Sequence, residues 1–160
     1  MAVNYTVVFS QRQRFGNEPD VNYPGVFVGQ EKDFPFDCPD VNPNETAVLF
    51  FNSYDVEGSN VFQINGVDVY GGLYQGPRGE TKDVAGRPGG PTRINIWMTH
   101  ELLVEPRHQL RATGNVLHVK SRTQSGHDTG DIDDFVLDNM VIMYKTTTAS
   151  RPLPTVEDRI

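Results

Sequence analysis

The apolar residues of this sequence occur in short clusters that glycine and proline repeatedly interrupt. The chain contains 15 glycines and 11 prolines, and the Val, Ile, Phe and Tyr runs between them are too short for long helices. Several runs alternate apolar and polar residues, which is typical of strands buried on one face. No segment has a convincing amphipathic helical pattern, so the sequence predicts an all-β protein.

The alternation predicts about eight strands. They are expected at residues 3–9, 26–28, 46–52, 61–64, 67–70, 92–104, 116–121 and 134–145. Asn65-Gly66 separates two of them and is typical of a two-residue hairpin turn. The closing strand is apolar on both faces after Asn139, which favours a central or bulged position in a sheet.

Two strands have faces that can be assigned from the pattern alone. In the first, alternate residues are apolar and share one face: Val3, Tyr5, Val7 and Phe9. In residues 116–121, Leu117 and Val119 are expected to point into the core, so His118 and Lys120 point outward.

The segments between the strands set the expected domain boundaries. Residues 16–44 contain five prolines and are expected to wrap around the sandwich, whereas the glycine-rich stretch 75–91 predicts a long loop. A chain of 160 residues fits one domain. We therefore expect a single β-sandwich domain over 1–146 and a flexible tail over 147–160.

Charge and cysteine content narrow the functional classes. The 14 Lys and Arg residues against 21 Asp and Glu give a net charge of −7, which argues against nucleic-acid binding. Cys38 is the only cysteine, so no intrachain disulfide can form. We expect a soluble protein without membrane insertion, because no signal peptide and no apolar run of membrane-spanning length is visible in this chain.

Four segments, in this order along the chain, carry a family resemblance. They are 62–70 (FQINGVDVY), 100–110, 114–119 (GNVLHV) and 133–139 (DDFVLDN). Over residues 46–145 the chain resembles galactose-binding-like jelly rolls, in which an Ile-Asn-Gly turn, a Gly-Asn-x-Leu-x-Val element and an acidic-aromatic closing strand follow one another. The resemblance implies a two-sheet antiparallel β-sandwich. It also implies a lectin-like role, as in carbohydrate-binding modules, and in some members a structural calcium ion near the closing strand.

The first candidate site surrounds Trp97. Arg93, Asn95 and Trp97 are expected on one face of a strand, where an aromatic ring beside polar groups would suit the apolar face and hydroxyls of a sugar. His100 and Tyr74 complete this predicted ligand-binding set. The alternative is ordinary packing, in which a loop or a second subunit covers Trp97.

The second candidate site is acidic. Its members are Asp128, Asp131, Asp133 and Asp134, with Asp138 nearby. Calcium takes six to eight hard oxygen ligands, which aspartates in a loop can supply, so this segment predicts a calcium site. The alternative is a solvated acidic turn in which Asp133 or Asp134 caps the start of a strand.

Three functional hypotheses follow. The first is a non-catalytic domain that binds carbohydrate or a small polar ligand; the sequence contains no Gly-x-Ser-x-Gly elbow or other catalytic motif. The second is a structural or assembly protein that forms a homo-oligomer through its jelly-roll surface and long loops. The third, a metal-dependent enzyme using His100, His108, His118 and His127, is disfavoured because these histidines are expected at the surface.

Overall fold

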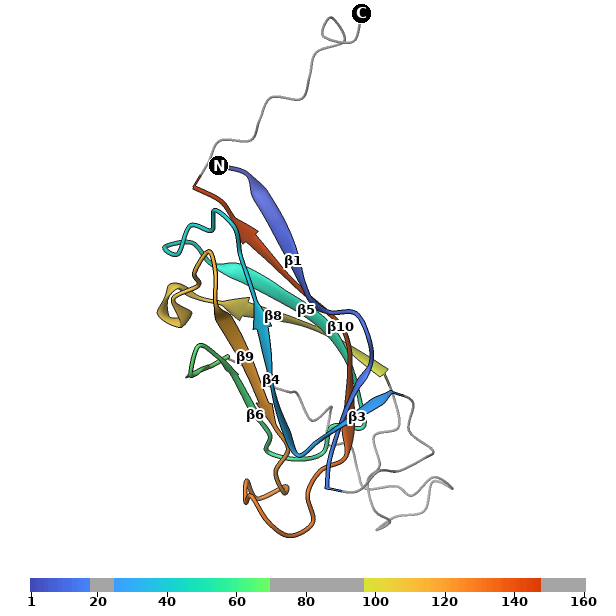
Figure 1. Cartoon of the computed structure of the whole chain (residues 1–160). Coiled ribbons are helices and arrows are strands. Elements are labelled where there is room, and N and C mark those ends of the chain that lie inside the picture. Colours follow the sequence, from blue (N-terminus) through green and yellow to red (C-terminus); the bar gives the residue numbers. More distant parts are fainter. Residues whose placement is uncertain (18–24, 70–96, 148–160) are drawn as a thin grey trace, which may run out of the picture.

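The computed structural model describes residues 1–17, 25–69 and 97–147, and these residues form two packed β-sheets. The six-stranded sheet contains β1 (Val3–Phe9), β2 (Gln13–Phe15), β3 (Val26–Gly29), β5 (Ala47–Tyr54), β8 (Trp97–Val104) and β10 (Phe135–Lys145). The four-stranded sheet contains β4 (Glu31–Phe36), β6 (Val61–Ile64), β7 (Val67–Asp68) and β9 (Asn115–Lys120). The all-β, two-sheet prediction is confirmed, and Figure 1 shows the two layers.

Strand β10 organises the larger sheet. Its C-terminal half pairs with β1, its N-terminal half pairs with β2, and β5 runs along its other side. The sheet then continues from β5 to β8. The register between β10 and β5 shifts after Asp138, and Asn139 has a positive φ of 49°, so the predicted central, bulged strand is confirmed.

The smaller sheet has the order β4-β9-β6-β7, and β6 and β7 form the predicted hairpin. Ile64 pairs with Val67 across a two-residue loop in which Asn65 and Gly66 have φ of 52° and 80°. Positive φ at both loop residues is the type I′ geometry that Asn-Gly favours. The Asn65 side chain then donates to the carbonyl of His108 at 2.9 Å, which ties the hairpin to the 3₁₀ turn Pro106–His108.

Two strands were not predicted. β2 is only three residues long and pairs in parallel with β3, so the sandwich is not purely antiparallel. β4 lies in the proline-rich stretch expected to wrap the sandwich, and Pro35 pairs with Val116 within it. In the part of the chain that the structure describes, β4 pairs on one side only, with β9, so proline is tolerated there.

The core lies between the sheets and is rich in aromatic rings. Phe15 of β2 stacks on Phe135 of β10, with centroids 5.0 Å apart, and its edge approaches Phe34 of β4 at 6.2 Å. Phe51 of β5 similarly contacts Phe62 of β6 at 5.2 Å. The Phe15–Phe34 and Phe51–Phe62 contacts join strands from opposite sheets, whereas Phe15 and Phe135 are paired within one sheet. Burial raises the pKa of Cys38 to about 12, so its thiol remains protonated in this core.

Some expectations fall outside the described residues. The loop at 75–91, the start of the strand expected at 92–104 and most of the tail at 147–160 lie there. Within the described ranges, no helix has the length and apolar character needed to cross a bilayer.

Candidate functional site

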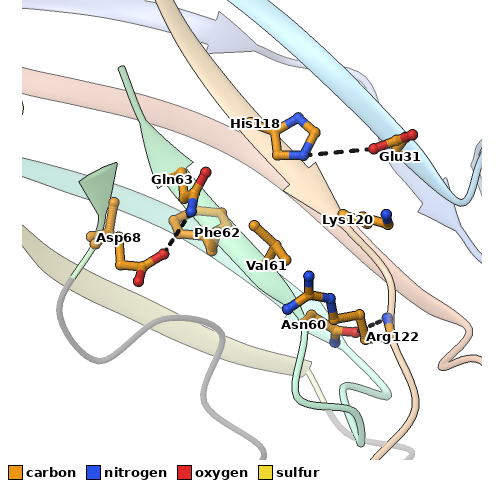
Figure 2. Close-up of a pocket in the computed structure, with 10 residues that line it drawn as sticks. Glu31, Asn60, Val61, Phe62, Gln63, Asp68, His118, Lys120 and Arg122 are labelled. Carbon is orange, nitrogen blue, oxygen red and sulfur yellow. Dashed lines mark hydrogen bonds and ion pairs between the residues drawn. The ribbon is translucent and has the colours of Figure 1, made fainter. Parts of the chain in front are cut away.

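A polar hollow of about 480 Å³ lies against the four-stranded sheet, on the side facing away from the core. Strand alternation explains its chemistry, because Leu117 and Val119 enter the core while His118 and Lys120 face outward, as predicted. The residues that line it are Glu31, Asn60, Val61, Phe62, Gln63, Asp68, Val69, His118, Lys120 and Arg122. Figure 2 shows them as sticks.

Strand register arranges these side chains in two cross-strand rows. One row runs across all four strands, through His118, Gln63 and Asp68 of the lining and through Asp33, which pairs with His118 next to the hollow. A second row contains Glu31, Lys120 and Val61. Directly paired residues in an antiparallel sheet point to the same side, so the four strands hold carboxylates, an amide and cations on one surface.

Polar contacts join two pairs of side chains within the first row and connect it to the second row. The Nδ1 atom of His118 lies 2.6 Å from an Asp33 carboxylate oxygen, and its Nε2 atom lies 3.7 Å from Glu31. Gln63 donates its amide to Asp68 at 2.9 Å. These contacts reduce the freedom of the side chains before any ligand arrives, which is the usual benefit of a preorganised site.

At the other end of the hollow, Asp128 neutralises two cations. It lies 2.8 Å from Arg122 Nε and 3.3 Å from Lys120 Nζ. The hydrogen bond from Arg122 is the largest cause of a lowered pKa for the Asp128 carboxyl. Desolvation opposes it, and the hydrogen bond from Lys120 and the two positive charges lower the pKa further. Because Lys120 and Arg122 already share this carboxylate, the described lining of the hollow does not have the unpaired cations typical of an anion site.

None of the residues that line the hollow presents the face of an aromatic ring to it. Phe62 is the only aromatic residue among them, and it is 3% exposed because its ring packs in the core. The described residues also contain no group of three or more His, Cys, Asp or Glu side chains arranged to hold a metal ion. The hollow can therefore donate and accept hydrogen bonds at several fixed points.

The structure places Trp97 on the other sheet, away from this hollow. Trp97 lies at the start of β8 with 43% of its surface exposed, and its ring centroid is 5.3 Å from that of Tyr54. The guanidinium of Arg12 lies 4.9 Å from the indole centroid. Arg93, Asn95 and Tyr74, the other predicted members of this site, lie outside the described residues.

His100 does not share a surface with Trp97. It is three residues along the same strand and points into the sandwich, where it is 5% exposed. Its Nε2 atom lies 2.7 Å from Ser53 Oγ, and its ring stacks on Phe51 at 4.6 Å. His108 is also buried, so the expectation of surface histidines is wrong for these two residues.

The burial of His100 predicts a pH effect on stability. Burial lowers the pKa of His100 from 6.5, so the folded protein keeps this ring neutral while the unfolded chain takes up a proton. The stability that the neutral His100 ring contributes is complete above about pH 6.5 and is lost as the pH falls below this value. Urea unfolding of the wild type and His100→Gln at pH 7.5 and pH 5.5 should show the steeper loss in the wild type. Parallel losses in the two proteins would contradict this prediction.

The acidic segment does not form one shared cation site. Asp133 Oδ2 accepts hydrogen bonds from the backbone of Glu57 and Gly58 and from the Asn60 side chain at 2.7–3.0 Å. Asp128 is paired with Arg122 and Lys120, as described above. Asp131 is exposed and Asp134 is half-buried. In the described part of the chain these four carboxylates do not form a group of three or more side chains that could hold a metal ion, and Asp128 and Asp133 have nitrogen donors as partners. The calcium site therefore stays a prediction.

The polar hollow was missed from the sequence. The outward position of His118 and Lys120 was predicted, and the hairpin register placed Gln63 near Asp68. What the sequence could not supply is the pairing of β9 with β4 and β6, which brings residues 31–33 and 61–63 to either side of His118. Such pairing over long sequence separations has no local signal.

Comparison with known proteins gives little further information. No family model and no curated protein matches the chain. Among solved structures, one similar chain is a carbohydrate-binding module of lichenase 5A from Cellvibrio mixtus in complex with cellotriose. It is 9% identical, with a TM-score of 0.30 over 91% of this chain and 99% of the module. A TM-score this low does not establish a shared fold, so the two-sheet β-sandwich assignment rests on the strand pairing.

Proposed function

We propose that this chain is a non-catalytic binding domain and that its ligand is a small hydroxyl-rich molecule of the carbohydrate class, bound in the polar hollow. The observation that carries the proposal is the row of Asp33, His118, Gln63 and Asp68, which crosses all four strands of one sheet. Sugar hydroxyls both donate and accept hydrogen bonds, and this row presents acceptors and donors at fixed spacing.

Charge pairing supports a neutral rather than an anionic ligand. The three basic side chains in the hollow, His118, Lys120 and Arg122, each lie within 4 Å of a carboxylate. An anion would compete with these carboxylates, whereas a neutral polyol can hydrogen-bond to both partners. Because the described lining residues offer no aromatic ring to stack on, we expect weak binding, with a Kd of ~1 mM or about −4 kcal/mol.

The test compares two matched glutamine variants. Gln63→Ala removes a side chain in the middle of the hollow, whereas Gln11→Ala removes an exposed glutamine away from it. In NMR or calorimetric titrations with a panel of neutral mono- and oligosaccharides, we expect Gln63→Ala to weaken binding about tenfold through the loss of one or two hydrogen bonds. Gln11→Ala should bind like the wild type. The absence of any sugar binding at ~20 mM would count against the carbohydrate class.

The Trp97 surface is a second candidate site for the same function. Its support is an exposed indole next to Tyr54, with Asn52 and Thr99 joined by a 2.9 Å hydrogen bond on the same two strands. Trp97→Ala separates the two sites. If it abolishes binding and Gln63→Ala does not, the ligand binds at Trp97 and the assignment to the hollow is wrong.

A further inference from the structure

The outer face of the six-stranded sheet is apolar where a monomeric sandwich is normally polar. Register aligns Tyr5, Met143, Val48 and Leu103 in one row across β1, β10, β5 and β8. Tyr5 is 67% exposed, Leu103 is 53% exposed, Met143 is exposed and Val48 is half-buried. The next row contains Val7, Val141 and Phe50 before it reaches Glu101. We call these two rows the apolar face.

In strand β1 the exposed side carries apolar residues. Its apolar residues Val3, Tyr5 and Val7 point to solvent, whereas Thr6 pairs with the buried Ile142 and so faces the interior. The sequence predicts Val3, Tyr5, Val7 and Phe9 together on one face, and the structure keeps the first three together. The register shift after Val7 allows Phe9, out of these four, to enter the core. A strand with its apolar side outward is expected where another surface covers it.

We propose that a second copy of this chain covers the apolar face, so that two six-stranded sheets pack face to face in a homodimer. A flat apolar sheet face is complementary to itself, and a two-fold axis then brings the same patch from both copies together. On the two rows, Glu101 is the only charged residue, and it lies at the β8 margin. The chain as a whole has a net charge of −7. The apolar face, however, offers almost no charge that a positively charged partner could bind.

The size of the face indicates how strong the dimer should be. Four strands spaced ~4.8 Å apart, with the two rows taking up about four residues of each strand at ~3.3 Å, span roughly 250 Å². Standard interfaces bury about 800 Å² per partner, and weak complexes bury less. The apolar face therefore lies within the few hundred Å² that soluble monomers rarely exceed, and it is small for a permanent dimer. We expect a reversible dimer with a Kd of ~10–100 µM.

Two exposed valines provide a matched test. Val7 on the apolar face and Val26 on β3 are 50% and 52% exposed, and each variant, Val7→Lys or Val26→Lys, adds one positive charge. By sedimentation and light scattering of the full chain up to ~500 µM, the wild type and Val26→Lys should approach twice the 17.9 kDa chain mass. Val7→Lys should remain at the single-chain mass, with at least a tenfold weaker association.

Several results would overturn the proposal. These are a wild type that stays at the single-chain mass at ~500 µM, well above the expected Kd, or an association that Val7→Lys and Val26→Lys weaken equally. A chain ending at Thr147 that dimerises while the full chain does not would show that residues 148–160 cover the face instead. If Val7→Lys melts more than ~5 °C below the wild type, Leu103→Lys on β8 replaces it with the same expected outcome. The ligand hollow is on the other sheet, so failure of this proposal leaves the proposed function unaffected.

Discussion

Replacing Phe15 with alanine is expected to lower the free energy of unfolding by about 3–5 kcal/mol. Phe15 is fully buried, stacks on Phe135 at an interplanar angle of 14° and meets Phe34 of the opposite sheet edge-on. Alanine would leave a cavity at a point where both sheets meet, and the short strand β2 offers little chain that could move to fill it. Urea unfolding followed by tryptophan fluorescence or circular dichroism measures the loss.

An exposed phenylalanine provides the control for this prediction. Phe27 of β3 is 37% exposed and lies under the guanidinium of Arg14 at 5.0 Å. We expect Phe27→Ala to cost less than ~1 kcal/mol. Phe15→Leu keeps most of the buried volume and should fall between the two alanine variants. Equal losses for Phe15→Ala and Phe27→Ala would show that Phe15 does not hold the two sheets together.

Replacing Asp133 with alanine is expected to cost about 3 kcal/mol at neutral pH. Asp133 lies just before β10, and its carboxylate accepts hydrogen bonds from three donors in residues 57–60, the segment between β5 and β6. Two of these donors are backbone amides that alanine would leave without this acceptor. The exposed neighbour Asp131 provides the control, and Asp131→Ala should change stability by less than ~0.5 kcal/mol. A loss below ~1 kcal/mol for Asp133→Ala would mean that water replaces the carboxylate.

The same carboxyl also predicts an unusual pH dependence. Burial raises the pKa of Asp133 from 3.8 to about 6, although its three hydrogen bonds act in the opposite direction. Between these two pH values the folded protein holds a proton that the unfolded chain has released, so this group contributes less stability as the pH rises from about 4 to about 6. The stability advantage of the wild type over Asp133→Asn should therefore shrink by about 2 kcal/mol between pH 4 and pH 7. An advantage that grows with pH would contradict the raised pKa.

The local parts of the fold could be predicted because each depends on neighbours in sequence. Asn65-Gly66 determines its own hairpin, and the alternation around Leu117 determines which side chains enter the core. β2 could not be found, because three residues are too few to show a period. Proline at position 35 argued against a strand, and only the position of β4 beside a single partner makes it acceptable.

The candidate site was less predictable because its residues come from strands that are far apart in the sequence. His118 was correctly placed outward, but its partners Asp33 and Gln63 come from strands about 85 and 55 residues away in sequence. His100 was placed with Trp97 in the predicted set, although an odd spacing of three residues puts two side chains on opposite faces of a strand. Asp133 was assigned to calcium from its composition alone, whereas the backbone amides that it binds lie in a distant loop.

The position of β10 determines the order in which this molecule can assemble. β1, β2 and β5 all pair with β10, which begins at Phe135. A nascent chain that has not yet reached this residue lacks the strand that joins these three, so the first strand must wait for one more than 130 residues later in the sequence. Contacts at such separation slow folding to milliseconds or seconds. During synthesis the outward apolar side of β1 would meanwhile remain accessible to chaperones and to other nascent chains.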